Sequence, residues 1–306
     1  MRKLYLLGKS ISHSSSPVMH NALYRQMGLD WHYAIKDCAT EQEARAFLEA
    51  REFIGLNVTM PYKPLACQMA SVQASTAKLA RGANVLARKG NHLLAFNVDG
   101  QGFASYLENS GCALAGKDVV VCGTGPTSLS VLHAAARGGA ARVVLVGRDV
   151  QRAQQVLAAY LEDLDRLAHT AMDVSGAQGG QRSLSATYED VNFSSGSYTT
   201  STQALVAADL IVDATPCGMH PDDAAPFDTA LLSAGQVVFD VVYGHGETKL
   251  LAAARAAGCQ AFCGEGMLVA QAVATATTLF EINDVNVCLD TEEMFRIMAD
   301  AAGFSC

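Results

Sequence analysis

The amino-acid sequence predicts an α/β protein with two domains, and three observations support this fold class. The chain has 306 residues, a length typical of about two domains. Short apolar runs rich in β-branched residues alternate with segments of helical periodicity, as expected of sheets covered by helices. One such run, residues 119–122, ends in a glycine-rich turn that leads into a helical pattern.

The first hundred residues predict a small α/β domain. Helix starts are expected at Ser16, a natural N-cap followed by Pro17, and at Thr40, which forms a capping box with Glu43. A lysine–glycine–asparagine turn predicts a hairpin, and a further helix is expected at residues 101–109. The expected strands span residues 4–7, 31–38, 54–59, 83–88 and 92–98.

The segment from residue 119 to residue 146 is typical of a unit that binds a dinucleotide. Gly123 allows a tight turn, Gly125 lets the backbone approach a pyrophosphate, and Ser128 is small enough for close packing of helix on strand. The N–H groups of the following helix, residues 126–137, would face the phosphates. A second strand, residues 141–146, completes the repeat and ends where the ribose of a bound dinucleotide should lie.

The second half of the chain continues the alternation after an irregular stretch. A helix is expected from Val150 to about Leu161, and residues 163–202 are polar, with one possible strand at 184–188 and a loop at 194–202. Regular structure then returns, with strands at residues 208–214, 237–242 and 261–263 and helices at 249–257, 267–280 and 291–302.

Composition excludes several classes of protein. A net charge of −8 disfavours nucleic-acid binding, which needs a basic surface. The 9 cysteines form no CxxC pair and lie near no histidine cluster, which predicts idle thiols in a reducing compartment and no metal site. No stretch approaches the roughly 20 apolar residues of a membrane span, and the N-terminal apolar run is too short for a signal peptide. We therefore expect a cytoplasmic protein that binds small molecules.

Several polar residues follow predicted strands, where open α/β sheets bind their ligands. The hydroxyl-rich loop at residues 8–17 is suited either to helix capping or to holding a carboxylate or a polyol. Thr59 and Lys63 follow the third strand, and Asp99 precedes a helix, where it could be a simple cap. Taken alone, each of these residues also has an ordinary structural interpretation.

Taken together, the motifs resemble the shikimate dehydrogenase family, including its quinate/shikimate dehydrogenase relatives, over nearly the whole chain. The resemblance implies a substrate-binding catalytic domain, residues 1–102 and 265–306, and a Rossmann-type, doubly wound NAD(P)-binding domain, residues 103–264. The motifs that carry it are Ser14-Ser15-Ser16-Pro17, Asn57 to Lys63, Gly82-Ala83-Asn84, Asn97 to Gly102, the glycine turn, Arg148 with Arg152, Ala214 to Met219, Asp240 to Tyr243, and Gly266-Met267-Leu268 with Gln271.

The resemblance also implies roles for individual residues. Lys63 and Asp99 become the catalytic pair, with Lys63 moving the proton while NAD(P)H supplies the hydride. Substrate contacts are implied for Ser14, Ser16, Thr59, Lys63, Asn84, Asp99, Tyr243 and Gln271. Cofactor contacts are implied for Gly123, Thr124, Gly125, Pro126, Thr127, Arg148, Asp149, Arg152, Thr215, Met219 and Gly264.

This sequence departs from the family pattern at three positions. Pro126 follows Gly125 where the family has adjacent glycines, and Val98 replaces a threonine near the substrate. The third departure is Gly147-Arg148-Asp149, which stands where the family has an Asn-Arg-Thr clamp. Arg148 and Arg152 suit the 2′-phosphate of NADP, whereas Asp149 would repel it or accept a hydrogen bond from the free 2′-hydroxyl of NAD. We expect NADP, with NAD as the alternative.

The implied activity is the reversible reduction of 3-dehydroshikimate to shikimate in the biosynthesis of aromatic amino acids, by a monomer or a homodimer. A quinate/shikimate dehydrogenase that uses NAD is the alternative within the enzyme class. A catalytically silent sensor on the same scaffold is the alternative from another class, although the presence of both Lys63 and Asp99 argues against it.

Overall fold

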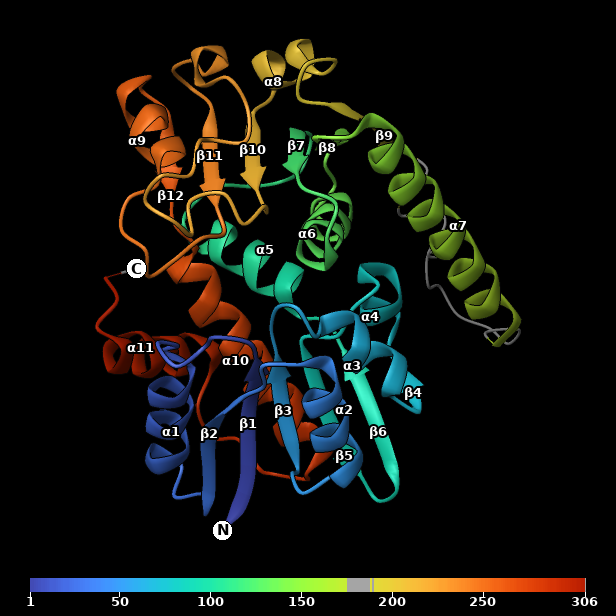
Figure 1. Cartoon of the computed structure of the whole chain (residues 1–306), viewed down its shortest axis with the longest axis vertical. Helices are drawn as coiled ribbons and strands as arrows, with labels where there is room; N and C mark the ends of the chain where they lie inside the picture. Colours follow the sequence, from blue (N-terminus) through green and yellow to red (C-terminus); the bar gives the residue numbers. More distant parts are fainter. Residues whose placement is uncertain (175–187, 189, 306) are drawn as a thin grey trace. The chain divides into compact units, whose positions relative to one another are not determined.

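The computed structural model describes residues 1–174, 188 and 190–305, which form two compact units (Figure 1). The first unit combines Met1–Phe103 with Gly266–Cys306, and the second, Ala104–Glu265, is inserted between these two segments in sequence. The substrate-binding and NAD(P)-binding roles expected of the two domains stay predictions. Each unit has its own six-stranded sheet.

The sheet of the first unit has the strand order β2-β1-β3-β5-β6-β4. β1, β2 and β3 are parallel, so their carboxyl ends lie at one edge of the sheet. β5 and β6 form the predicted hairpin, with β5 antiparallel to β3. The strands are β1 (Arg2–Gly8), β2 (Trp31–Asp37), β3 (Gly55–Val58), β4 (Val72–Gln73), β5 (Val85–Lys89) and β6 (His92–Phe96).

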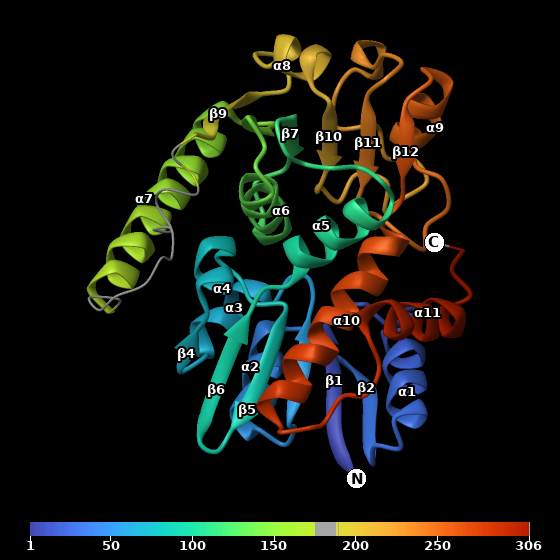
Figure 2. The same cartoon turned by 180° about the vertical axis from the view of Figure 1, so that it is seen from behind.

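Helices cover both faces of this sheet. α2 (Glu41–Ala50), α3 (Lys63–Met69) and α4 (Ser75–Ala80) share one buried cluster with the strands. On the other face lie α1 (Ser16–Gln26), α10 (Gly264–Ile282) and α11 (Thr291–Ala302), as Figure 2 shows. Phe280 of α10 packs there against Tyr24 and Trp31, so the last part of the chain completes the core of the first unit.

The second unit contains a fully parallel sheet of order β12-β11-β10-β7-β8-β9. The chain moves outward from β7 to β9 and then crosses to β10 on the other side of β7, which is the doubly wound order of the Rossmann fold. This confirms the predicted fold class. The strands are β7 (Asp118–Cys122), β8 (Arg142–Gly147), β9 (Asn192–Ser197), β10 (Leu210–Asp213), β11 (Val237–Asp240) and β12 (Gln260–Phe262).

The faces of this second sheet are also covered by helices. Val238 packs in a cluster with α8 and α9, whereas its neighbour Phe239 points to the opposite face and meets Tyr106 of α5. The helices of the unit are α5 (Asp99–Asn109), α6 (Pro126–Arg137), α7 (Val150–Val174), α8 (Thr202–Ala207), a short 3₁₀ turn (Thr229–Leu231) and α9 (Lys249–Ala256).

The structure corrects the sequence-based prediction in the polar stretch. α7 continues to Val174 instead of ending near Leu161, because Leu164 and Ala168 extend its buried stripe. Residues 194–202 were expected to form a loop, but residues 192–197 pair with β8 as an edge strand. The possible strand at residues 184–188 lies outside the described residues except for Tyr188.

In the first unit, the sequence-based prediction lacked α3, α4 and β4 and misplaced one helix cap. α1 begins at Ser16 itself, and Ser15 is the cap residue, although its side chain makes no capping hydrogen bond. The Ser16 hydroxyl instead accepts from Ser14.

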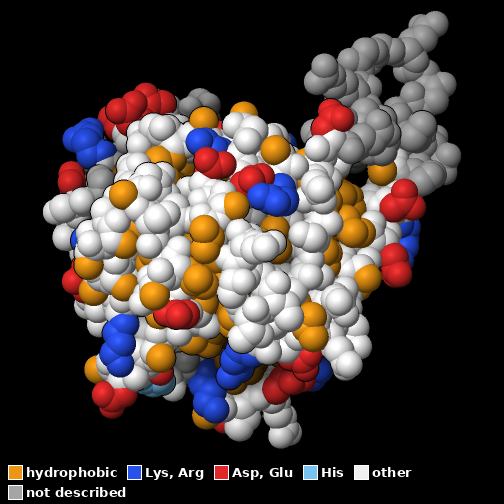
Figure 3. Space-filling view, turned by 90° about the horizontal axis from the view of Figure 1, so that it is seen from above, with side chains coloured by type: hydrophobic (Ala, Val, Ile, Leu, Met, Phe, Trp, Pro, Cys, Tyr) orange, Lys and Arg blue, Asp and Glu red, His pale blue; other side chains and the backbone are white. Residues whose placement is uncertain are grey.

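Acidic and basic side chains are interspersed among uncharged ones on the face drawn in Figure 3. Within residues 1–174, 188 and 190–305, no helix combines the length and the hydrophobicity needed to cross a bilayer.

Candidate active site

A buried ion pair lies at the edge of the first sheet. Lys63 Nζ donates a hydrogen bond to Oδ2 of Asp99 at 2.6 Å. The side chains are only 11% and 9% exposed, so little water competes for this contact. The second carboxylate oxygen, Oδ1, accepts from Nδ2 of Asn84 at 2.6 Å. The structure therefore brings together three residues that the sequence analysis singled out.

Strand ends and helix starts position this cluster. Lys63 is the first residue of α3, directly after the turn that follows β3, and Asp99 is the first residue of α5, separated from the end of β6 by Asn97 and Val98. Asn84 precedes β5, and its backbone N–H donates to Phe96 at the end of β6. The hairpin therefore carries Asn84 and Asp99 to the same end of the sheet, although Lys63 and Asp99 are 36 positions apart.

The hydroxyl-rich loop lies at the carboxyl end of β1. Ser14 Oγ donates to Ser16 Oγ at 3.2 Å and also accepts from the Ser16 N–H at 3.2 Å. Thr59, at the carboxyl end of the neighbouring strand β3, donates its N–H to Leu7. Because β1 and β3 are adjacent and parallel, these hydroxyls lie at the same end of the sheet as the start of α3.

Two other predicted substrate residues have different surroundings. Gln271 lies on α10, and its Nε2 donates to Leu268 of the same helix at 2.8 Å. α5 passes so close to this helix that a Cβ at Gly102 would lie 2.6 Å from the Gln271 backbone nitrogen. Tyr243 belongs to the second unit, where it follows β11.

A buried hydrogen-bond network behind this site was not found from the sequence. Asn57 Oδ1 accepts from the hydroxyl of Tyr33 at 2.8 Å, and Asn57 Nδ2 donates to Thr275 at 2.9 Å and to the Asn84 carbonyl at 3.3 Å. It thereby links β2, β3 and α10 to the residue that bonds Asp99. The sequence signal that could have revealed this network is Asn57 itself, because an asparagine within an otherwise apolar strand usually has buried hydrogen-bond partners.

The predicted cofactor turn lies where the strand order of the second sheet reverses. Gly123 follows β7 with φ of +109°, and a Cβ there would lie 3.0 Å from the Ala214 carbonyl, so glycine is needed for the turn itself. Gly125 caps α6 and has no atom within 4 Å of where a Cβ would lie. The α6 N-terminus, without a capping side chain, suits a phosphate.

The loop carrying Thr215 and Met219 is held at both ends by carboxylates. Asp213 Oδ1 accepts from Thr215 N–H at 2.9 Å, and Asp223 accepts from the N–H groups of Gly218 and His220 at 3.0 Å. Asp213 is fully buried beside Asp240, its partner in the register of β10 and β11. Burial, and then repulsion by Asp240, raise the pKa of Asp213 to about 7.

The ribose end of the predicted cofactor site follows β8. Arg148 and Arg152 are exposed there. Asp149 Oδ1 accepts from the N–H groups of Gln151 and Arg152 at 2.9 and 3.1 Å, so it caps α7. The N-capping role explains an acidic residue at this position without any contact to a ribose. Gly264 likewise has a structural explanation, because a Cβ there would clash with the Val241 carbonyl.

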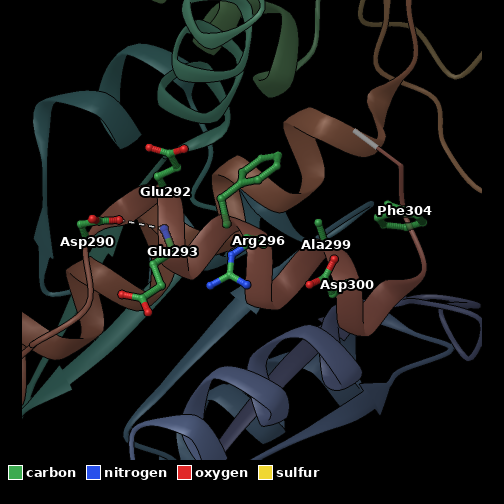
Figure 4. A pocket seen from close by; sticks show the side chains of 8 residues that line it. Asp290, Glu292, Glu293, Arg296, Ala299, Asp300 and Phe304 are labelled. Atoms are coloured by element: carbon green, nitrogen blue, oxygen red, sulfur yellow. Dashed lines mark hydrogen bonds between the residues drawn. The ribbon is translucent and has the colours of Figure 1, made fainter.

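A hollow of about 440 Å³ lies along α11 (Figure 4) and contains none of these candidates. Asp290 accepts there from Glu293 N–H at 2.8 Å, which caps the helix. Among the described residues, no group of three or more His, Cys, Asp or Glu could hold a metal ion. The residues that line the hollow are Asp290, Glu292, Glu293, Phe295, Arg296, Ala299, Asp300 and Phe304.

Comparison with known proteins identifies the family. A family model described as the shikimate dehydrogenase substrate binding domain matches residues 6–86. The shikimate dehydrogenase (NADP⁺) of Symbiobacterium thermophilum is 35% identical over 274 residues, which cover 88% of this chain and 86% of the relative. The chain belongs to the shikimate dehydrogenase family.

Solved structures of a shikimate dehydrogenase and of a quinate dehydrogenase share the fold over almost the entire chain. The Thermus thermophilus shikimate dehydrogenase in complex with NADP(H) and shikimate has a TM-score of 0.78 at 22% identity, covering 98% of this chain and 100% of that one. The Corynebacterium glutamicum quinate dehydrogenase in complex with NAD has a TM-score of 0.76 at 26% identity, covering 98% and 99%.

Proposed function

We propose that this protein is an NADP-dependent shikimate dehydrogenase, which reversibly reduces 3-dehydroshikimate to shikimate. The observation that carries the proposal is the buried contact between Lys63 and Asp99, with Asn84 on the second carboxylate oxygen. The relatives named shikimate dehydrogenase (NADP⁺) support it at up to 35% identity.

Reduction of a ketone to an alcohol needs a hydride on carbon and a proton on oxygen. When bound at the turn after β7, NADPH supplies the hydride. Lys63 as an ammonium polarises the carbonyl and gives its proton to the oxygen, and in the oxidation of shikimate the neutral amine accepts the hydroxyl proton. Asp99 holds the Lys63 amine in place and, with Asn84, offers hydrogen bonds to a neighbouring hydroxyl of the substrate.

The remaining substrate candidates fit a polyhydroxylated carboxylic acid. Ser14 and Ser16 offer hydroxyl groups to the carboxylate, because the Ser14 O–H that donates to Ser16 can rotate toward a ligand, and Thr59 and Gln271 offer hydrogen bonds to hydroxyls. Gln271 keeps its side-chain oxygen for this role, since its nitrogen donates within α10. For Tyr243, the family resemblance alone supports a substrate contact.

The residues of the second unit fit a dinucleotide. The space at Gly125 and the uncapped start of α6 allow a pyrophosphate to approach the backbone. Arg148 and Arg152 supply two guanidinium groups for a 2′-phosphate, and Asp149 is engaged in capping. These observations favour NADP. The full set proposed to contact the cofactor is Gly123, Thr124, Gly125, Pro126, Thr127, Arg148, Arg152, Thr215 and Met219, with Gly264 and Asp149 assigned to structural roles.

One steady-state assay tests this function. The purified protein is given shikimate or quinate, each with NADP⁺ or NAD⁺, and formation of reduced nicotinamide is followed by absorbance. We expect the largest kcat/KM for shikimate with NADP⁺. No turnover in any combination, together with a rise in Tm on adding shikimate, would instead identify the silent sensor.

Cofactor choice is tested separately by Arg148→Ala and Arg152→Ala. Each variant should raise the KM for NADP⁺ and leave the KM for NAD⁺ unchanged. Arg166→Ala, which removes an exposed arginine further along α7, is the matched control. Equal effects on both cofactors would contradict the assigned 2′-phosphate contact.

A quinate dehydrogenase that uses NAD is the second candidate. The solved quinate dehydrogenase in complex with NAD, at 26% identity, supports it. A larger kcat/KM for quinate with NAD⁺ than for shikimate with NADP⁺ would establish this alternative.

We further propose that the protein works in the cytoplasm as a monomer or a homodimer. The described cysteines are free thiols, as is usual in a reducing compartment. Light scattering on the purified protein would distinguish the two assemblies.

A further inference from the structure

The hydroxyl-rich loop is held by a carboxylate from the neighbouring strand. Asp37 is the last residue of β2 and lies opposite Gly8, the last residue of β1. Its Oδ1 accepts from the N–H of Ser10 at 2.9 Å, and its Oδ2 accepts from the N–H of Ile11 at 3.1 Å. Both oxygens therefore bind consecutive backbone N–H groups at the start of the loop.

This contact fixes an unusual backbone conformation. Ser10 has φ of +58°, in the left-handed region that residues other than glycine rarely adopt. Such a conformation persists only where surrounding contacts impose it. The two hydrogen bonds to Asp37 supply such contacts, and the packing of Ile11, which is only 8% exposed, adds another.

Hydrogen bonds connect the position of Ile11 to Ser14 and Ser16. Ile11 accepts from the Ser14 N–H at 3.0 Å, and Ser14 Oγ in turn bonds to both the N–H and the hydroxyl of Ser16. Each step of this path is a hydrogen bond within one loop. A change in the position of Ile11 would therefore displace both hydroxyls.

The charge of Asp37 also determines which donors are left for an anion. Because its carboxylate accepts the Ser10 and Ile11 N–H groups, neither is directed at a ligand. The hydroxyls of Ser14 and Ser16 are neutral groups, and the Ser14 O–H that donates to Ser16 can rotate toward a ligand, so both can donate to an anion. Binding of a carboxylate there depends on how accurately these neutral groups are placed.

We propose that Asp37 is a positioning residue that orders the serine loop for the substrate carboxylate, an inference that rests on the proposed function. Asp37 acts through Ser10, Ile11 and Ser14 and takes no part in hydride or proton transfer. Its loss should weaken substrate binding and leave the chemical step and the cofactor site unchanged.

The test compares Asp37→Ala and Asp37→Asn with the wild-type enzyme. Asp37→Ala should raise the KM for shikimate roughly tenfold with kcat and the KM for NADP⁺ nearly unchanged, since hydrogen bonds to a charged group are lost. Asp37→Asn keeps one acceptor oxygen and should be intermediate. Asp30→Ala, which removes an exposed carboxylate just before the same strand, is the matched control and should behave as wild type.

Amide hydrogen exchange provides a readout that needs no substrate. In Asp37→Ala, the Ser14 amide should exchange faster than in wild type and in Asp30→Ala, although it never contacts Asp37. A wild-type enzyme inactive with shikimate would overturn the proposed function alone. An unchanged KM for shikimate, a fall in kcat without a change in KM, or an unchanged Ser14 exchange rate would overturn the role of Asp37.

Discussion

Lys63 donates to Asp99 at 2.6 Å, and both side chains are about nine-tenths withdrawn from solvent. The contact joins the start of α3 to the start of α5, both at the same end of the first sheet. An amine held in this way lies in one defined position, which general acid–base catalysis requires.

Lys63→Ala should therefore lower kcat for shikimate oxidation by roughly 10²–10⁴, the usual contribution of general acid–base catalysis. The KM for NADP⁺ should change little, because the proposed role of Lys63 is to move a proton at the substrate oxygen, whereas the pyrophosphate is proposed to bind at the turn after β7. Steady-state kinetics measure both quantities, and Lys78→Ala on the exposed face of α4 is the control. Unchanged turnover in Lys63→Ala would remove this residue from the mechanism.

Tyr33→Phe should lower the free energy of unfolding by roughly 1–3 kcal/mol, the cost of leaving a buried acceptor without its donor. The acceptor is Asn57 Oδ1, which receives the Tyr33 hydroxyl at 2.8 Å in the network behind the site. Urea denaturation measures the effect. Tyr5→Phe deletes a hydroxyl from the half-buried Tyr5 of β1 and should have a much smaller effect; equal effects would show that the network adds no stability.

The two glycines of the cofactor turn should respond differently to alanine. Gly125→Ala should leave Tm unchanged, since a Cβ there meets no protein atom within 4 Å, but should raise the KM for NADP⁺ by occupying the space proposed for the pyrophosphate. Gly123→Ala should lower Tm, because its φ of +109° and the nearby Ala214 carbonyl both oppose a side chain. Thermal denaturation with cofactor titration separates the two effects. A lower Tm in Gly125→Ala with an unchanged KM would contradict the assignment.

Asp213 should make the stability of the second unit depend on pH. Its pKa is raised from 3.8 to about 7, so the folded protein keeps a proton that the unfolded chain loses between these values. The contribution of Asp213 to stability is therefore present below about pH 4 and is lost as the pH rises to about 7.

Asp213→Asn removes this loss while keeping an oxygen acceptor for the Thr215 N–H. The denaturation midpoint of the variant should rise relative to wild type as the pH is raised through this range. Parallel urea titrations at acidic and at mildly alkaline pH measure the difference. A difference that is the same at both pH values would show that Asp213 does not titrate in the folded protein.

From strand periodicity and turn glycines, which are local signals, the sequence predicted the fold class; through short motifs that resemble the family, it also singled out Lys63, Asp99 and Asn84. It could not show that Lys63 and Asp99 meet, since that contact depends on how the β5–β6 hairpin is placed beside β3. Their roles in catalysis stay predictions.

Other features depend on tertiary context that local signals do not contain. β9 contains serines and glycine, which have little intrinsic preference for strands, and it forms because β8 offers it an edge. The polar composition after Leu161 obscured the apolar stripe that extends α7. Asp37 and Asn57 gave no local signal of their hydrogen-bond partners, which come from other elements.

The discontinuity of the first unit determines the order in which the chain can fold during synthesis. Ala104–Glu265 emerges from the ribosome before Gly266–Cys306 does. All strands of the inserted unit are therefore present while the N-terminal sheet still lacks α10. Phe280 and Leu279, which lie against Trp31 and Gly55 in the folded protein, are then still missing. The apolar face of the N-terminal sheet that they cover therefore stays exposed in the nascent chain. The N-terminal sheet is consequently synthesised first but completes its core last.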